Sequence, residues 1–171
     1  MKILVTGGVR SGKSAHAEGL MAAYDDVTYV AAGPVPSVDD AAWAARVAAH
    51  VARRPASWTT VESTDLGTAI RPATPTLVDC LGTWLTAQLD ELGAWDDPSV
   101  LDALELRTDA AITAITAAED LVLVTNEVGL GVVPAHASGR LFADLLGTLN
   151  QRVGAVVDEV HLVVAGRVLR L

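Results

Sequence analysis

Short, continuous apolar runs recur along the chain, and a segment with helical spacing follows most of them. The four strongest runs are Lys2–Thr6, Val27–Ala32, Thr76–Cys80 and Leu121–Thr125. Runs of this length without polar alternation are typical of strands buried on both faces of a parallel sheet. A weaker run at Trp58–Glu62 predicts a further short strand.

Helices are predicted between these strands. They cover Lys13 to about Ala23, Asp39 to about Ala52, the residues after Cys80 as far as Leu92, Ser99–Ala118, and Arg140 to about Ala155. The last segment repeats apolar residues at helical spacing, at positions 141, 145, 149 and 153. Strands alternating with helices indicate an α/β fold: a mostly parallel sheet flanked by helices, with ligands at the carboxyl ends of the strands.

The end of the chain departs from this alternation. Glu159–Ala165 and Val168–Leu171 are predicted to be two strands with no helix between them. Gly166-Arg167 predicts a tight hairpin, so the last strand is expected to be an antiparallel edge. The chain has 171 residues and no linker or internal repeat, so residues 1–171 are expected to form a single domain.

Composition narrows the class of protein. A net charge of −9 counts against a nucleic-acid-binding surface. The one cysteine, Cys80, excludes an internal disulfide and a cysteine metal cluster. No apolar run reaches the length of a membrane span, and Met1-Lys2 leads into a strand rather than a signal peptide. A cytoplasmic protein is therefore expected.

The first strand runs directly into the phosphate-binding pattern G-x-x-x-x-G-K-[ST]. Its members are Gly7, Gly8, Val9, Arg10, Ser11, Gly12, Lys13 and Ser14. The glycines let backbone N–H groups turn toward a di- or triphosphate at the positive end of the next helix. Lys13 is expected to supply a catalytic charge to the β- and γ-phosphates, and Ser14 a hydroxyl to Mg²⁺. The chain has only two lysines beside ten arginines, and one of the two is in this loop.

A Mg²⁺-nucleotide enzyme also needs an acid near this loop, and two strand ends offer one. Asp79 ends the apolar run Thr76–Val78, which is the usual form of a metal-supporting acid. Glu127 follows the run that ends at Asn126. Either acid could instead cap a helix or be solvated, and the pattern favours a function more for Asp79 than for Glu127.

Three of the four histidines carry weak signals. His16 lies on the first turn of the helix after the loop, where it faces either phosphate or a neighbouring strand. His136 lies in a loop rich in glycine and proline, and His161 alternates within a strand. Both are expected to be structural or solvated.

His50 differs because Arg53 and Arg54 follow it closely. Paired arginines beside an imidazole suit the transfer of a phosphoryl group to nitrogen. They equally suit the end of a helix, where the dipole favours cations. Spacing alone favours this second interpretation.

Together, several segments resemble one family. They are Gly7–Ser14 with Ala15-His16-Ala17-Glu18, Ala44–His50 through Arg53-Arg54-Pro55, Trp58–Glu62, Val78-Asp79-Cys80-Leu81, Val124–Pro134 and Asn150-Gln151-Arg152. The family is the bifunctional adenosylcobinamide kinase/adenosylcobinamide-phosphate guanylyltransferase of cobalamin biosynthesis. The resemblance spans nearly the whole chain in the right order, and Thr125–Pro134 is far more specific to it than the phosphate-binding loop.

This resemblance implies two reactions. Adenosylcobinamide is phosphorylated with ATP or GTP, and GMP then passes from GTP to that phosphate through a guanylylated histidine, giving adenosylcobinamide-GDP. His50 matches the family's nucleophile, Arg53, Arg54 and Glu62 match positions that contact the guanine nucleotide, and Asp79 matches an acidic nucleotide-site position. The resemblance also implies a RecA-like P-loop NTPase fold and a homotrimer.

Two other functions stay open from the sequence. A generic P-loop small-molecule kinase would have no covalent step, and His50 would be dispensable. A GTP-binding regulatory module would need a guanine-specificity motif such as Asn-Lys-x-Asp. The only lysines are Lys2 and Lys13, so that motif is absent.

Overall fold

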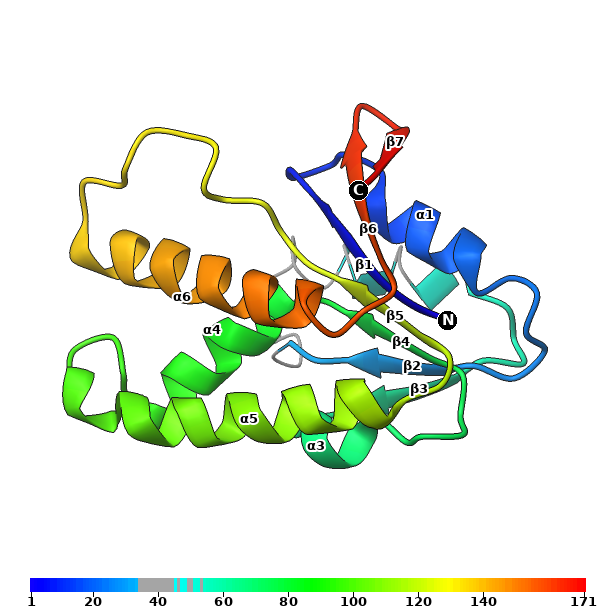
Figure 1. The fold of residues 1–171 in the computed structure, drawn as a ribbon, viewed down its shortest axis with the longest axis horizontal. Helices are drawn as coiled ribbons and strands as arrows, with labels where there is room; N and C mark the ends of the chain where they lie inside the picture. The colour runs from blue at the N-terminus through cyan, green and yellow to red at the C-terminus, as the bar shows by residue number, and fades with distance from the viewer. Residues whose placement is uncertain (34–44, 46, 49–50, 53) are drawn as a thin grey trace.

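The structure is a computed structural model that describes residues 1–33, 45, 47–48, 51–52 and 54–171. In this described part, seven strands form one sheet in the order β3-β2-β4-β5-β1-β6-β7 (Figure 1). They are β1 (Lys2–Gly7), β2 (Thr28–Ala31), β3 (Thr59–Glu62), β4 (Thr76–Asp79), β5 (Leu121–Val124), β6 (Glu159–Val164) and β7 (Arg167–Arg170). All neighbouring pairs are parallel except β6 and β7.

Helices lie on both faces of the sheet (Figure 1). The described ones are α1 (Lys13–Leu20), α3 (Leu66–Ala69), α4 (Leu81–Leu92), the 3₁₀ turn η1 (Pro98–Val100), α5 (Leu101–Ala117) and α6 (Ala137–Gly154). Helix α1 packs on one face, whereas α3, α4, α5 and α6 pack on the other. None of the described helices is long and apolar enough to cross a membrane.

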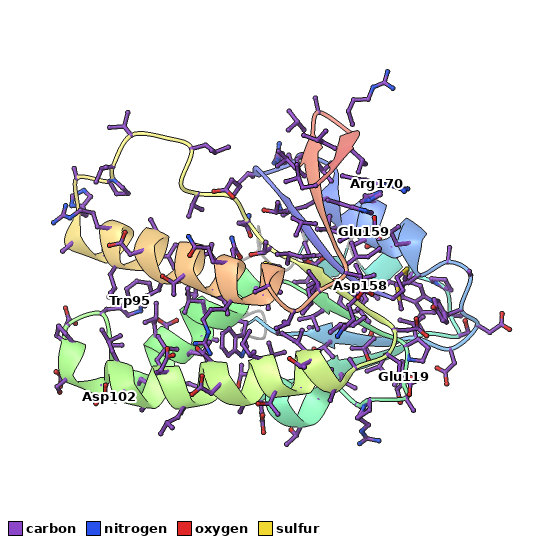
Figure 2. All side chains as sticks on the ribbon, in the orientation of Figure 1. Trp95, Asp102, Glu119, Asp158, Glu159 and Arg170 are labelled. Atoms are coloured by element: carbon purple, nitrogen blue, oxygen red, sulfur yellow. The ribbon has the colours of Figure 1, made fainter. Side chains whose placement is uncertain are left out.

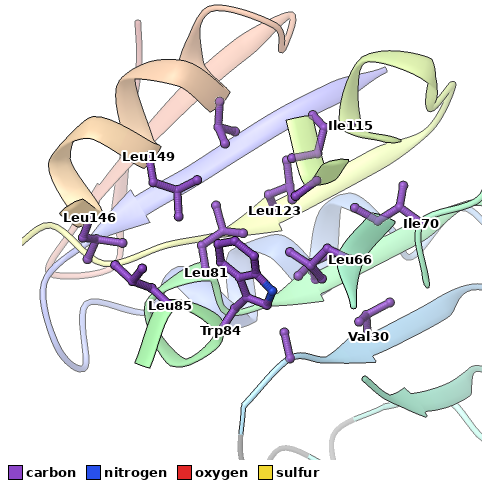
Figure 3. Packing of buried hydrophobic residues seen from close by; sticks show 14 of the residues in the cluster. Val30, Leu66, Ile70, Leu81, Trp84, Leu85, Ile115, Leu123, Leu146 and Leu149 are labelled. Carbon is purple, nitrogen blue, oxygen red and sulfur yellow. The ribbon is translucent and has the colours of Figure 1, made fainter. Parts of the chain in front are cut away.

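Alternation along the strands produces two separate cores. Leu4, Val78 and Leu123 point toward α3–α6, where Trp84 fills the centre of the larger cluster (Figure 3). The residues next to these along each strand point to the opposite face, toward α1. They include Ile3, Val5, Leu77, Val122 and Val124. Both faces of the central strands are therefore apolar, which explains the continuous runs seen in the sequence.

The hairpin at the chain end is antiparallel, as predicted, but its turn lies one residue earlier than expected. Val164 pairs with Arg167, which leaves Ala165 and Gly166 as the two loop residues. Both have positive φ, 49° and 76°, the geometry of a type I′ turn. The Gly166 N–H donates to the Ser11 carbonyl at 2.8 Å, so the hairpin rests on the phosphate-binding loop.

Most predicted elements are confirmed, with shifts at their ends. Helix α1 stops at Leu20 instead of continuing to about Ala23, and α6 begins at Ala137 instead of Arg140. The short helix α3 was missed because its one turn carries no periodic signal. In the helix predicted from Asp39 to Ala52, the described residues 45, 47–48 and 51–52 are helical, and the others lie outside the described residues.

Replacement of Leu123 by Ala should destabilise the protein strongly. Leu123 is fully buried in the central strand β5, and such a truncation costs about 2–5 kcal/mol in free energy of unfolding. Leu106→Ala is the matched control because that side chain is 71% exposed on α5. Urea unfolding followed by circular dichroism should separate the two variants, and equal midpoints would contradict the assigned core.

Candidate nucleotide-binding site

Three adjacent strands bring the phosphate-binding loop, Asp79 and Glu127 together at the carboxyl end of the sheet. Val5 of β1 pairs with Val124 of β5, and Val124 pairs with Asp79 of β4. The phosphate-binding loop follows β1, and Glu127 follows β5. Ligands bind at this end in open α/β sheets, so the topology brings together groups that are distant in sequence.

Backbone contacts from two sides hold the loop. Gly7 has φ 154°, and a Cβ built there would lie 2.4 Å from the Val163 carbonyl oxygen of β6. On the other side, the Glu127 N–H donates to the Gly7 carbonyl at 3.2 Å. Gly12, at the start of α1, has φ 96°. Glycine at positions 7 and 12 is thus required by close approach and by backbone conformation, respectively.

Lys13 and Ser11 supply hydrogen-bond donors inside the loop. The Lys13 side chain is buried, and its Nζ donates to the Gly8 carbonyl at 3.1 Å. The Ser11 hydroxyl is buried without a hydrogen-bond partner among the described residues. A buried donor of this kind gains a partner when an anion binds, so the loop suits a phosphate.

Asp79 belongs to a chain of contacts that runs across the sheet. The Tyr29 hydroxyl of β2 donates to Asp79 Oδ2 at 3.0 Å. The guanidinium carbon of Arg54 lies 3.2 Å from the centroid of the Tyr29 ring, and Arg54 Nη1 donates to Thr60 Oγ1 at 2.9 Å. Burial, followed by the nearby Asp79 charge, raises the pKa of Tyr29, so the phenol stays protonated and donates. Sequence reasoning missed Tyr29; its one signal was a polar-tipped ring in a buried strand.

Glu62 lies on the same side of the sheet as Asp79. Both residues pair with Ala31 of β2, from opposite sides. Residues in register on neighbouring parallel strands project to the same face. Ala31 packs against the α1 cluster, so Glu62 and Asp79 both project to the α1 face. Glu62 is exposed at the end of the edge strand β3.

Glu127 lies beside the loop, but its carboxylate is used locally. Its Oε1 accepts a hydrogen bond from the Gly129 N–H at 3.0 Å. Next to it, Asn150 of α6 accepts from the Thr125 hydroxyl at 2.7 Å and donates to the Asn126 carbonyl at 3.1 Å. These bonds anchor the start of the segment that follows β5.

His16 faces a neighbouring strand, one of the two orientations that its position allowed. Its Nε2 lies 2.9 Å from Nδ1 of His161, which is buried, and the other ring nitrogen of His161 lies 2.8 Å from Glu159 Oε2. Figure 2 labels Glu159 and Arg170 on the β6–β7 hairpin. Burial and then the charges of His161 and Arg170 lower the pKa of His16.

The structure describes most of the predicted site residues around the carboxyl end of the sheet. They are the whole phosphate-binding loop with Lys13 and Ser14, together with Arg54, Glu62 and Asp79. His50 and Arg53 lie outside the described residues. The hydroxyl of Ser14 and the carboxylate of Asp79 are hard oxygen ligands of the type that Mg²⁺ prefers. The described residues contain no cluster of three or more His, Cys, Asp or Glu suited to a metal. These donors fit an ion completed by phosphate oxygens and water.

Comparison with known proteins identifies the family of the chain. The family described as "Cobinamide kinase / cobinamide phosphate guanyltransferase" matches residues 3–171. The chain belongs to this family. The bifunctional adenosylcobalamin biosynthesis protein CobU of Salmonella typhimurium is 42% identical, with 97% of each chain covered. The protein of the same name from Escherichia coli is 40% identical, again over 97% of each. The bifunctional adenosylcobalamin biosynthesis protein CobP of Pseudomonas aeruginosa is 36% identical, over 97% of this chain and 94% of the relative.

Solved structures extend the comparison to the fold. A prototypical ATPase from the type III secretion system of pathogenic bacteria superposes with a TM-score of 0.58 at 14% identity. The match covers 94% of this cobinamide kinase/guanylyltransferase family member and 50% of the ATPase chain, so the chain spans about half the length of that protein. The predicted P-loop NTPase fold is confirmed.

Gly7→Ala should deform the loop, because its Cβ would lie 2.4 Å from the Val163 carbonyl oxygen of β6, as well as 2.8 Å from the Ser11 hydroxyl. We expect a lower thermal unfolding midpoint and nucleotide affinity reduced by at least about fivefold, as strain in a packed backbone costs on the order of 1–3 kcal/mol. Gly8→Ala is the control for stability, since no atom lies within 4 Å of a Cβ there. Equal unfolding midpoints for the two variants would contradict the close approach.

Stability should fall in mild acid partly because of His16. Its folded-state pKa lies below the ordinary value of 6.5, so the unfolded chain takes up this proton first. The stability linked to His16 is therefore present above that value and is lost as the pH falls through it toward the folded pKa. Urea unfolding at several pH values should show a smaller loss for His16→Gln than for the unsubstituted protein. If the free energy of unfolding depended on pH with the same slope in both proteins, this linkage would be refuted.

Proposed function

We propose that this protein phosphorylates adenosylcobinamide with ATP or GTP and then transfers GMP from GTP to adenosylcobinamide phosphate. Membership of the cobinamide kinase/guanylyltransferase family over residues 3–171 is the observation that carries this proposal. The phosphate-binding loop at the carboxyl end of β1 supports it, because both reactions need a bound triphosphate. A single loop is proposed to serve both.

In the kinase reaction, the loop amides and Lys13 hold the triphosphate. The oxygen of the substrate hydroxyl bonds to the γ-phosphorus in line as the bond to the β–γ bridging oxygen breaks. The nucleoside diphosphate leaves, and the hydroxyl proton passes to solvent. Lys13 stabilises the charge that develops on the phosphoryl oxygens. Ser14 and Asp79 would hold Mg²⁺, which supplies further charge neutralisation when bound.

In the guanylyl transfer, His50 is the proposed nucleophile. Its neutral imidazole nitrogen bonds to the α-phosphorus of GTP. The bond from that phosphorus to the oxygen between the α- and β-phosphates breaks, and pyrophosphate leaves. A phosphate oxygen of adenosylcobinamide phosphate then displaces the imidazole, giving adenosylcobinamide-GDP and free His50. Arg53, Arg54 and Glu62 are proposed to contact the guanine nucleotide. The stacked guanidinium of Arg54 is held on the α1 face, where Glu62 also projects.

A homotrimer is proposed from the resemblance to this family. A cytoplasmic location is proposed from the triphosphate substrates and the lone cysteine. The following experiment tests the covalent histidine step, and it also tests the generic kinase and the regulatory module that the sequence alone left open.

His50→Ala should separate the two reactions. The kinase step needs no histidine intermediate, so phosphorylation of adenosylcobinamide should stay within about threefold of wild type. Formation of a covalent GMP adduct and GMP transfer should both be lost. Intact-protein mass spectrometry after incubation with GTP and Mg²⁺ measures the adduct, and peptide mapping locates it. Lys13→Ala is the comparison variant, in which both reactions should fall by at least about a hundredfold.

Three results would overturn the assignment. An adduct that persists in His50→Ala, or that maps to His16, would exclude His50 as the nucleophile. No adduct on the unsubstituted protein would favour a generic kinase. Slow GTP hydrolysis without transfer to adenosylcobinamide would favour a regulatory module.

A further inference from the structure

We propose that Tyr29 is a positioning residue that joins the two sides of the nucleotide site, by holding Asp79 through its hydroxyl and Arg54 through its ring. This inference rests on the proposed function, because it takes Asp79 to act with Mg²⁺ and Arg54 to contact the nucleotide. It adds a residue that touches neither the nucleotide nor the metal.

The contacts place Tyr29 between two charged groups of opposite sign. Its side chain is 2% exposed and lies on the α1 face of β2. The hydroxyl donates to Asp79 Oδ2 at 3.0 Å, and the ring lies 3.2 Å from the guanidinium carbon of Arg54. One rigid side chain therefore fixes both partners.

Stacking matters for Arg54 because it orients a flat group. A guanidinium recognises phosphate oxygens through parallel N–H bonds, so its plane must be set correctly. The ring sets this plane from one side, and the bond from Nη1 to Thr60 Oγ1, at 2.9 Å, sets its rotation. Thr60 pairs with Tyr29 in the sheet register, so both supports come from adjacent strands.

The hydroxyl matters for Asp79 because it orients a carboxylate at a strand end. Asp79 is the last residue of β4, and only Cys80 separates it from the start of α4 at Leu81. A hydrogen bond from a buried phenol restricts the carboxylate rotamer, in the way that outer partners orient metal-binding side chains. The two halves of Tyr29 thus have separable effects, one on Mg²⁺ and one on the nucleotide.

Two substitutions separate these effects. Tyr29→Phe keeps the ring and deletes the hydroxyl, so it should raise the Mg²⁺ concentration for half-maximal nucleotide binding by about threefold to tenfold, the range of one hydrogen bond. Nucleotide affinity without Mg²⁺ should stay within about twofold. Tyr29→Leu also deletes the stack and should weaken affinity without Mg²⁺ by at least about threefold.

Isothermal titration calorimetry of the full chain provides the readout. The probe is a GTP analogue with a methylene bridge between its α- and β-phosphates, so no guanylyl group can transfer. Tyr24→Phe is the matched control, because Tyr24 also hydrogen-bonds an aspartate, Asp120, which immediately precedes β5 at its amino end. This control should leave both quantities within about twofold of wild type, as expected for a distant site.

The outcomes are distinct. A Mg²⁺ requirement in Tyr29→Phe equal to that in Tyr24→Phe would overturn the role of the hydroxyl. Undiminished affinity without Mg²⁺ in a folded Tyr29→Leu protein would overturn the role of the ring, and if that variant fails to fold, Tyr29→Met, which also lacks the aromatic face, provides the same test. These are binding measurements, so they stand whether or not a covalent adduct forms. Failure of the proposed function would instead appear as absence of that adduct on the unsubstituted protein.

Discussion

Strand β6 passes so close to Gly7 that no side chain fits between them, and the site depends on this contact. A Cβ at Gly7 would lie 2.4 Å from the Val163 carbonyl oxygen. The Glu127 N–H bonds the loop from the side of β5, and the Gly166 N–H bonds it from the hairpin turn. Because all three contacts involve backbone, the loop is held by the sheet itself. The parallel β5-β1-β6 arrangement is thus what makes a phosphate cradle possible here.

The two faces of the sheet have different tasks. The face under α3–α6 is covered by four helices and carries the larger apolar cluster. The face under α1 combines a smaller apolar cluster with polar groups, of which Tyr29 and Thr60 lie within their strands and Glu62 and Asp79 lie at the carboxyl ends. Stability is supplied mainly by the first face, whereas the charged groups of the proposed chemistry gather on the second. Tyr29 contributes both to stability and to the site, since its ring packs in the core and its hydroxyl donates to Asp79.

Much of this arrangement could be predicted from the sequence. Continuous apolar runs identified the buried strands because those strands have helices on both faces. The loop pattern predicted glycines at positions 7 and 12, where the close approach of β6 and a positive φ require them. The positions of Asp79 and Glu127 also followed from strand ends. Element ends were less predictable: α6 starts three residues early, at a position where apolar periodicity gives no cue.

Side-chain partnerships across strands could not be predicted. The Tyr29–Asp79 bond joins residues 50 positions apart, and the His16–His161 contact joins residues 145 apart. Such pairs depend on strand order and register, which local patterns do not encode. Glu127 was an ambiguous candidate for a different reason, because its carboxylate accepts a local bond from the Gly129 N–H within a loop whose conformation the residue pattern does not specify.

A count of bound nucleotides tests most directly whether one loop serves both reactions. Equilibrium dialysis with the methylene-bridged GTP analogue should give one site per chain, and an ATP analogue should displace it completely, because both triphosphates need the same loop amides and Lys13. Two sites per chain, or an ATP analogue that binds without displacing the GTP analogue, would contradict a shared cradle.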